Sequence, residues 1–528
     1  MIKTEIRLPL DYSGEDIKKA IAEHLPVGRD EIRNYKLIRR ELVSLDGGFF
    51  YNVRIGVEFS PEREAGLLKM KKKVSLFDEM TFETRAYRGE YRPIVCGFGP
   101  SGIFAALVLS EAGARPIVIE RGLATDEREK KVNLFKTLGV IDPECNVQYG
   151  EGGAGTYSDG KLKVGGMDKY KLKVLTELVS SGAPEEIIYT VGAHLGTDKL
   201  SDIVKRMRER IVSLGGEVHF STKLTDVKIK DGKVKAVIAE RGGERIEFPT
   251  DTLILASGHS AKDVFELLLE KGASLIPRGF GIGVRIEHPR EYINDLVWGK
   301  DRPDSLGAAS YHLVTHLEGG RSVYSFCMCP GGVVVPAASE AGGIVTNGMS
   351  EYRRDAENSN AAFLVSVTPE DFPSDSPLAG IALQREIERR AYSVGGGNYK
   401  APAIKMGDFL EGRSPTSNFS VKPSYAIGVE PHSLLEYLPS YITDSLRAAI
   451  GDFDDWMRGF KLSDAPMTGP ETRSTSPIRV LRDESFTAIG IKGLYPIGEG
   501  AGYSGGIVSS ARDGVMVAES VILRSNDN

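Results

Sequence analysis

The chain has 528 residues, 41% of them hydrophobic, so it can bury a large core and is expected to divide into two or more domains. Its formal net charge is -6, with 67 Lys and Arg residues interspersed among 73 Asp and Glu residues, which excludes a strongly charged surface for nucleic acid or anionic membrane. The sequence starts without the apolar stretch of a signal peptide and contains no apolar run long enough to span a bilayer. We therefore expect a cytoplasmic protein whose partner is a small molecule.

Residues 1–88 are predicted to form a small N-terminal α/β accessory domain. Apolar residues alternate at Lys3–Leu8, Tyr35–Arg40 and Phe49–Phe59, which is typical of half-buried strands, and Gly14–His24 has the spacing of a helix. Nothing in this segment indicates catalysis.

A glycine-rich turn follows the next predicted strand, at residues 93–96. Its glycines have the spacing G-x-G-x-x-G at Gly97, Gly99 and Gly102. Gly97 permits a tight turn, Gly99 leaves room for a pyrophosphate, and Gly102 lets the following helix pack closely on the sheet. The turn is therefore predicted to bind a dinucleotide, with an ordinary glycine turn as the alternative.

The segments after the turn complete a strand–helix–strand unit. A helix is predicted at Ile103–Ala112 and a second strand at Pro116–Ile119, directly before Glu120. Free N–H groups at the start of the helix favour a phosphate, and Glu120 can accept hydrogen bonds from a ribose. The unit alone does not distinguish FAD from NAD. The cofactor-binding residues predicted in it are Gly97, Gly99, Pro100, Ser101, Gly102, Glu120 and Arg121.

Further glycine-rich segments punctuate the rest of the chain. The loop Gly150–Gly160 contains too much glycine for a plain connector. A β-meander is predicted around hairpin turns between residues 227 and 248, and the apolar strand after it ends in Ala256-Ser257-Gly258. A later strand ends in Gly498-Glu499 and leads into a helix predicted at Val508–Leu523.

The order of these turns resembles that of the two-dinucleotide-binding flavoproteins of the glutathione-reductase type. The resemblance implies a non-covalent FAD, with Glu499 at its ribityl chain and the start of the last helix facing the flavin ring. It also implies that the loop Gly150–Gly160 runs along the cofactor, although a surface loop with Asp159 and Lys161 in solvent is the alternative. The further cofactor-binding residues that it implies are Gly152, Gly153, Ser158, Gly160, Lys161, Ala256, Ser257, Gly258, Gly498, Glu499, Gly505, Gly506 and Ile507.

The segments 149–162, 283–289 and 326–332 narrow the resemblance, because they are similar to signatures of the uncharacterised bacterial FAD-dependent dehydrogenases, also described as NAD(FAD)-utilising dehydrogenase-like. The implied fold class is α/β, with a Rossmann-type FAD-binding domain at 89–275 and 465–528. An inserted mixed α+β substrate or cap domain is expected at 276–464. The resemblance implies no particular substrate, because a fold alone does not determine a function.

Five residues are the candidates for catalysis. Cys327 and Cys329 could form a dithiol–disulfide couple, but their C-x-C spacing differs from the C-x-x-C or C-x₄-C spacing of redox-active pairs in flavin disulfide reductases, so packing or substrate contact is the alternative. His259 follows the turn at 256–258 and His288 lies on a predicted strand, and either could act as an acid or base or be a structural histidine. Arg473 could place its guanidinium over the flavin or on an anionic substrate. No cluster of residues indicates a metal site.

The predicted function is that of an oxidoreductase that transfers hydride or electrons between an unidentified donor and a small-molecule substrate through flavin N5. Gly281-Ile282-Gly283 lacks the third glycine of a second dinucleotide turn, so NAD(P)H is expected to dock transiently or not at all. Two alternatives remain open, a flavin-dependent factor that modifies or binds RNA and a flavin redox sensor without turnover.

Overall fold

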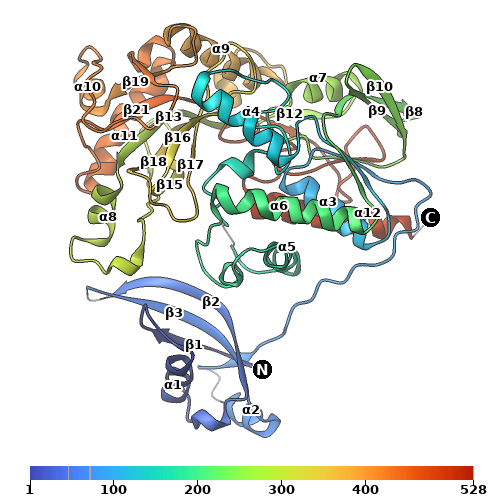
Figure 1. Ribbon diagram of the computed structural model, residues 1–528, viewed down its shortest axis with the longest axis vertical. Coiled ribbons are helices and arrows are strands. Elements are labelled where there is room, and N and C mark those ends of the chain that lie inside the picture. The colour runs from blue at the N-terminus through green and yellow to red at the C-terminus, as the bar shows by residue number, and fades with distance from the viewer. Residues whose placement is uncertain (46, 70–72, 163–164, 527–528) are drawn as a thin grey trace. The chain divides into compact units, whose positions relative to one another are not determined.

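The computed structural model describes residues 1–45, 47–69, 73–162 and 165–526 (Figure 1). The chain divides into two compact units, of which the first joins Met1–Glu83 to Leu162–His194 and the second joins Thr84–Lys161 to Leu195–Asn528. The predicted mixed α/β class is confirmed. The division into domains at residues 88, 275 and 464 stays a prediction, and it did not anticipate that residues 162–194 group with the N-terminal segment.

The first unit contains an antiparallel sheet with the order β2-β3-β1-β4. Alternate residues of the first strand are buried, so one face of the sheet forms a core with the helices. The predicted helix Gly14–His24 is confirmed at both ends, because the side chain of Ser13 accepts a hydrogen bond from the backbone N–H of Asp16 and fixes its start. The elements are β1 (Ile2–Leu8), α1 (Gly14–His24), β2 (Asn34–Leu45), β3 (Gly48–Glu58), α2 (Pro61–Leu67), β4 (Ser75–Leu76) and α5 (Lys169–Ser180).

The second unit contains a parallel five-stranded sheet with the order β23-β11-β5-β6-β7. Its strands are short and buried, and helices α3 and α12 pack against each other beside it (Figure 1). The last strand and helix come from a segment about four hundred residues after the first strand. The elements are β5 (Ile94–Cys96), α3 (Pro100–Glu111), β6 (Ile117–Ile119), α4 (Thr125–Leu138), α6 (Gly196–Ser213), β7 (Glu217–His219), β11 (Leu253–Leu255), α7 (Lys262–Glu270), β23 (Leu494–Pro496) and α12 (Ile507–Ser525).

Three smaller sheets accompany it, one of which is the antiparallel pair of residues 333–336 and 346–349. The predicted meander is confirmed as an antiparallel sheet of β8 (Lys223–Lys230), β9 (Lys233–Arg241) and β10 (Glu244–Pro249). A second pairing joins β12 (Leu275–Pro277) to β22 (Ile478–Val480), which are two hundred residues apart in sequence.

A seven-stranded sheet with the order β14-β15-β18-β13-β21-β19-β20 forms the other half of the second unit. All its neighbouring strands are antiparallel except β19 and β20, and the apolar face of β13 and β18 shares a core with α11. The elements are β13 (Phe280–Pro289), α8 (Arg290–Trp298), β14 (Val314–His316), β15 (Ser322–Cys329), β16 (Val333–Pro336), β17 (Thr346–Met349), β18 (Asn358–Val367), α9 (Ala379–Val394), β19 (Ala401–Lys405), α10 (Met406–Glu411), β20 (Val429–Pro431), α11 (Ser440–Trp456) and β21 (Pro466–Glu471).

Among the described residues, none of the helices combines the length and the apolar character that crossing a membrane requires.

Candidate cofactor site

The G-x-G-x-x-G turn connects β5 to α3, and each glycine meets a different constraint. Gly97 has φ +103°, and a Cβ atom there would collide with the carbonyl of Ala256. A Cβ atom on Gly102 would collide with the carbonyl of Gly97. At Gly99 the nearest atom to an added Cβ would be the Cα of Gly153, at 3.7 Å, so this position has free space in front of it.

The start of α3 is open to an anion. Gly99 is its N-cap and offers no side-chain acceptor to the N–H groups of the first turn, and Pro100 and Ser101 follow. The turn before Glu499 meets this helix, because a Cβ atom on Gly498 would lie 2.5 Å from the Ser101 Oγ. Free N–H groups and the positive end of a helix of 12 residues favour a phosphate here.

The carboxylate of Glu120 is buried and holds the surrounding turns together. Its oxygens accept hydrogen bonds from the backbone N–H groups of Phe98, Gly122 and Gly150, each at 2.9 Å. Three bonds leave acceptor capacity on a carboxylate, which has about four lone-pair positions, so a ribose hydroxyl remains compatible with this geometry.

Arg121 is engaged by protein groups rather than directed at a ligand. Its Nη2 lies 2.5 Å from the Asp263 carboxylate, and its guanidinium lies 4.5 Å from the centre of the Tyr149 ring. These acidic and aromatic neighbours raise the pKa of Arg121 despite its desolvation. The geometry disfavours the predicted contact with the cofactor.

The loop after residue 150 lies against the dinucleotide turn. The N–H of Gly152 donates to the carbonyl of Phe98 at 2.8 Å, Gly153 faces Gly99, and a Cβ atom on Gly155 would contact Pro100 and Ile507. The loop therefore connects the starts of α3 and α12, as expected for a segment that follows a bound dinucleotide.

Asp159 and Lys161 at the end of this loop are both desolvated, which argues against the alternative that they face solvent. Asp159 is buried, and its carboxylate accepts hydrogen bonds from the Arg354 guanidinium at 2.9 and 2.5 Å. The Lys161 ammonium donates to the carbonyl of Met328, and desolvation lowers its pKa. Ser158 and Gly160 are bonded to each other in the same loop, through Ser158 Oγ and the Gly160 N–H at 3.1 Å.

The turns at 256–258 and 498–500 also meet, because a Cβ atom on Gly500 would collide with Gly258. Between them Glu499 makes no side-chain hydrogen bond to any described residue, and desolvation raises its pKa to about 7, against a smaller opposing effect of Arg278. A desolvated carboxylate without a donor suits a ligand hydroxyl. Gly505 and Gly506 are exposed, and α12 starts after Gly506 without a side-chain cap, beside Ile507.

Glu499 gives a testable pH dependence of stability in the cofactor-free protein. Because its pKa rises from 4.5 to about 7 on folding, the folded state retains a proton that the unfolded state releases. The free energy of unfolding should therefore fall between about pH 4.5 and about pH 7, and Glu499→Gln should reduce this fall. Urea unfolding of both proteins across this range measures it, and the same pH dependence in both would contradict the raised pKa.

The two histidine candidates differ in position. His288 is fully buried on β13, its Nε2 lies 2.8 Å from the carbonyl of Phe460, and burial lowers its pKa to about 4. This position disfavours contact with a substrate. His259 is partly accessible and adjoins the turn at 256–258, and desolvation followed by the Arg473 charge lowers its pKa to about 4, so it is neutral at pH 7.

Arg473 forms a buried ion pair instead of reaching a ligand. Its Nε and Nη2 donate to the two carboxylate oxygens of Glu388 at 2.9 and 2.8 Å, and its Nη1 donates to Ser339 and Ser260. Both partners of the ion pair are less than 5% exposed. With all three nitrogens engaged, the geometry disfavours a catalytic role for Arg473.

Cys327 and Cys329 do not lie on a regular strand, where residues two positions apart would share one face. The pairing of β15 with β18 shifts register between Phe326 and Cys329, and Cys327 has φ +39°, so the strand carries a bulge. Arg285 Nη1 holds the Cys327 carbonyl at 2.8 Å. The Cys327 side chain is exposed and that of Cys329 is buried, and the two cysteines do not form a disulfide.

The contacts that sequence reasoning missed join residues far apart in the chain. Asp159 and Arg354 are one example, and the carbonyl of Met328 bound by Lys161 is another. The residues around Asp159, Lys161 and Arg354 would also fit a side chain that faces solvent. The local sequence therefore does not predict which distant group each of them contacts.

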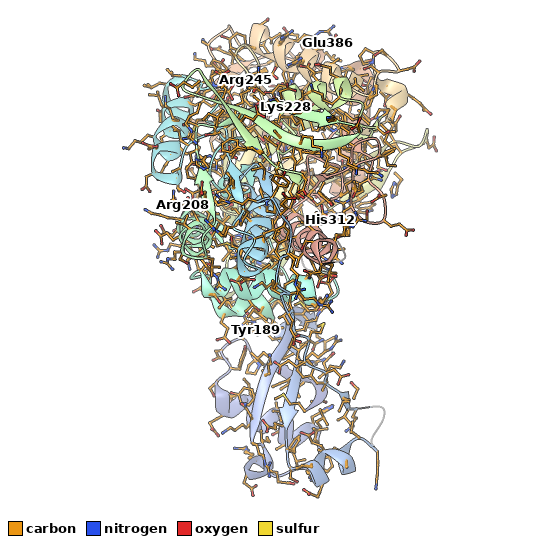
Figure 2. The ribbon with its side chains drawn as sticks, turned by 90° about the vertical axis from the view of Figure 1, so that its right-hand side faces the viewer. Tyr189, Arg208, Lys228, Arg245, His312 and Glu386 are labelled. Carbon is orange, nitrogen blue, oxygen red and sulfur yellow. The ribbon has the colours of Figure 1, made fainter. Side chains whose placement is uncertain are left out.

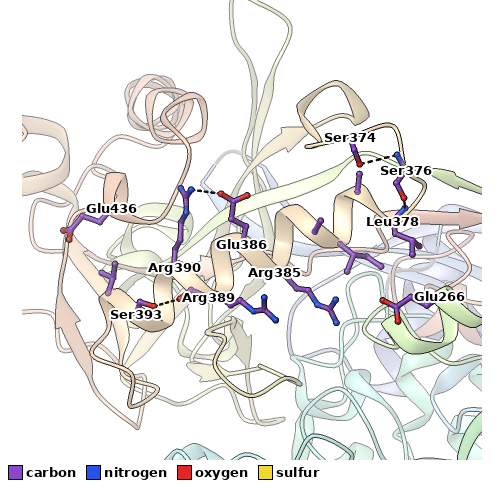
Figure 3. A pocket seen from close by; sticks show the side chains of 14 residues that line it. Glu266, Ser374, Ser376, Leu378, Arg385, Glu386, Arg389, Arg390, Ser393 and Glu436 are labelled. Carbon is purple, nitrogen blue, oxygen red and sulfur yellow. Dashed lines mark hydrogen bonds and ion pairs between the residues drawn. The ribbon is translucent and has the colours of Figure 1, made fainter.

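A surface pocket of about 790 Å³ lies along α9 (Figure 3). Two of its arginines pair with acids, Arg385 with Glu340 at 3.1 Å and Arg390 with Glu386 at 2.6 Å. None of the predicted cofactor-binding residues lines it. The charged lining residues are Glu266, Arg385, Glu386, Arg389, Arg390 and Glu436.

Residues 279–474 match the family described as FAD-dependent protein, C-terminal domain-like. An uncharacterized protein of Clostridium beijerinckii is 43% identical over 526 residues, which cover 98% of this chain and 97% of that protein. Among solved structures, the flavin-dependent halogenase CmlS shares 14% identity at a TM-score of 0.39, over 84% of this chain and 60% of that chain. A geranylgeranyl bacteriochlorophyll reductase-like protein from Thermoplasma acidophilum shares 12% identity at a TM-score of 0.37, over 83% and 79%. Likeness at these TM-scores does not indicate a shared reaction.

Proposed function

Because the chain belongs to the family of the Clostridium beijerinckii protein and contains the FAD-dependent C-terminal domain, we propose that it is an FAD-dependent oxidoreductase. FAD is its cofactor. In this proposal hydride or electrons pass between an unidentified donor and an unidentified small molecule. The proposal includes membership of the uncharacterised bacterial FAD-dependent dehydrogenases and a cytoplasmic location.

One observation carries the proposal: three glycine turns from distant segments meet around uncapped helix starts and an unpaired carboxylate. The loop 150–160 contacts the turn Gly97–Gly102 through Gly153, and the turn 498–500 contacts it through Gly498. In a protein core, free N–H groups and a desolvated carboxylate are costly unless a polar ligand satisfies them. A dinucleotide with phosphates and hydroxyl groups supplies both kinds of partner.

The chain's residues would hold FAD in distinct ways. The start of α3 would bind the diphosphate, Glu120 a ribose, and Glu499 a hydroxyl of the ribityl chain. When bound, FAD supplies two-electron chemistry at flavin N5. The uncapped start of α12 would stabilise negative charge at the edge of the flavin ring, because the positive end of the helix dipole lies there.

The side chains beside this site can orient a substrate without themselves being oxidised. His259 is neutral at pH 7, so it offers one ring N–H donor and one acceptor. Lys161 carries an amino group on the loop that follows the cofactor turn, and the bulge places the thiol of Cys327 in an exposed position. We propose these three as the residues that contact substrate.

An absorbance spectrum of the purified protein tests the proposal first. We expect a flavin band near ~450 nm in stoichiometric amount, released on denaturation because the FAD is non-covalent. Anaerobic NADH and then NADPH are added, and rapid bleaching by one of them identifies a pyridine-nucleotide-dependent reductase. A flavin that neither nucleotide reduces indicates a substrate-side dehydrogenase or a sensor. Absence of flavin after incubation with FAD would refute the proposed function.

A further inference from the structure

Two arginines lie side by side at the pairing of β12 with β22. Arg278 directly follows β12, and Arg479 lies in the middle of β22 opposite Ile276. The backbone N–H of Arg278 donates to the carbonyl of Pro477 at 2.8 Å, which continues the pairing. Both side chains are partly accessible to solvent.

Neither arginine forms an ion pair with any residue that the structure describes. Arg278 Nη1 donates to the hydroxyl of Thr475 at 3.3 Å, and Arg479 Nε and Nη2 donate to the carbonyl of Gly502 at 3.2 and 3.1 Å. These acceptors are neutral. The Nε and Nη2 of Arg278 and the Nη1 of Arg479 therefore retain unused donors in two planar groups suited to oxyanions.

The absence of an ion pair here contrasts with three other desolvated arginines of this unit. Arg285, Arg473 and Arg482 each lie 2.5–2.8 Å from a carboxylate oxygen. At Arg278 desolvation and then the neighbouring Arg479 lower the pKa, and the carboxylate of Glu499 offsets only part of their effect. A second cation beside a desolvated cation is unfavourable unless an anion joins them.

The arginine pair adjoins the cofactor site. Gly502, whose carbonyl Arg479 binds, closes the turn that begins at Gly498, because its N–H donates to the carbonyl of Glu499 at 2.9 Å. The ring of Tyr503 lies 5.2 Å from the Arg479 guanidinium and steadies it. The pair is built on β12 and β22, whereas the diphosphate of the cofactor has its own donors at the start of α3.

We propose that Arg278 and Arg479 form the subsite that binds an oxyanion group, a phosphate or a carboxylate, of the small molecule that exchanges electrons with FAD. This inference rests on the proposed function. The two guanidinium groups fix the charged end of that molecule beside the turn 498–502, so that its reacting end is held near the flavin. The substrate class is therefore an anionic metabolite or nucleotide.

Titration of inorganic phosphate into the FAD-containing protein tests the subsite, at constant ionic strength and with calorimetry and flavin absorbance as readouts. We expect saturable binding that Arg278→Gln and Arg479→Gln each weaken about tenfold or more, because each removes a charged hydrogen-bond donor. Arg278→Lys should retain part of the affinity. Acetate titrated in the same way distinguishes the two oxyanions, since the tighter ligand identifies the group.

Arg245→Gln is the matched control, because the Arg245 side chain lies on the β-meander, is 68% exposed and belongs to neither the arginine pair nor the cofactor site (Figure 2). It should bind phosphate as the natural protein does, and all variants should keep equal FAD content and thermal stability.

Phosphate binding that is unsaturable, or equal in the Gln variants, would overturn the inference while leaving the proposed function intact. Loss of FAD from only the Arg278 and Arg479 variants would also overturn it, because the pair would then belong to the cofactor. A natural protein that binds no FAD even after incubation with it refutes the proposed function, and calorimetry still decides whether an anion binds.

Discussion

The variant Gly99→Val is expected to fold normally and to lose most of its affinity for FAD. The backbone of Gly99 has φ −82°, which valine adopts, and an added Cβ would meet only the Cα of Gly153 at 3.7 Å. The new side chain would instead occupy the space in front of the helix start. Overpacking costs about 1–3 kcal/mol and each 1.4 kcal/mol is tenfold, so we expect affinity to fall about 10- to 100-fold.

Fluorescence titration of the apoprotein with FAD measures this loss. Gly451→Val is the control, because Gly451 is an exposed helix residue with no atom within 4 Å of an added Cβ. Gly97→Val should instead reduce the amount of folded protein. Valine rarely adopts φ +103°, and its Cβ would collide with the carbonyl of Ala256. Unchanged FAD affinity in Gly99→Val would contradict the assignment of the start of α3 to the diphosphate.

Arg473→Met should lower the free energy of unfolding by about 3–5 kcal/mol, because it leaves Glu388 charged, buried and without its partner. Arg473 and Glu388 are 4% and 3% exposed, so solvent cannot replace the lost bonds. The double variant Arg473→Met/Glu388→Met should recover much of the loss, because both charges are then removed. Urea unfolding followed by tryptophan fluorescence measures this, since both tryptophans, Trp298 and Trp456, lie in the segment that the seven-stranded sheet occupies.

This experiment also separates the two interpretations of Arg473. If Arg473 acts on the flavin or on substrate, Arg473→Met should change flavin reduction while the urea midpoint stays near that of the natural protein. If Arg473 instead serves the ion pair, Arg473→Met should lower the urea midpoint strongly. The double variant should then recover much of that midpoint.

Much of the fold could be predicted because its elements carry local signals. The helix Gly14–His24, the strands of the meander and the turn Gly97–Gly102 each follow from the residues within a few positions. The assembly of the turns into one site was inferred from their order along the chain, and the structure brings those turns together. Their roles in binding stay predictions.

The contacts that escaped sequence reasoning have no local signal. Whether Arg473 meets a ligand or Glu388 depends on a helix 85 residues away, and the pairing of Asp159 with Arg354 spans 195 residues. At the bulge, Arg285 donates to the carbonyl of Cys327 from β13, which lies two strands away in the same sheet. Period-two alternation assumes a regular strand, and a single inserted residue removes that assumption.

The assembly of the five-stranded sheet constrains when the protein can acquire its cofactor during synthesis. Strand β5 with its dinucleotide turn leaves the ribosome early, but β23 and α12 follow about four hundred residues later. At typical elongation rates this separation lasts roughly 20–80 s, during which the sheet lacks its edge strand β23 and α3 has no α12 beside it. FAD capture is therefore an event of the nearly finished chain, and a nascent chain stalled before β23 would expose the apolar surface of α3 to chaperones and proteases.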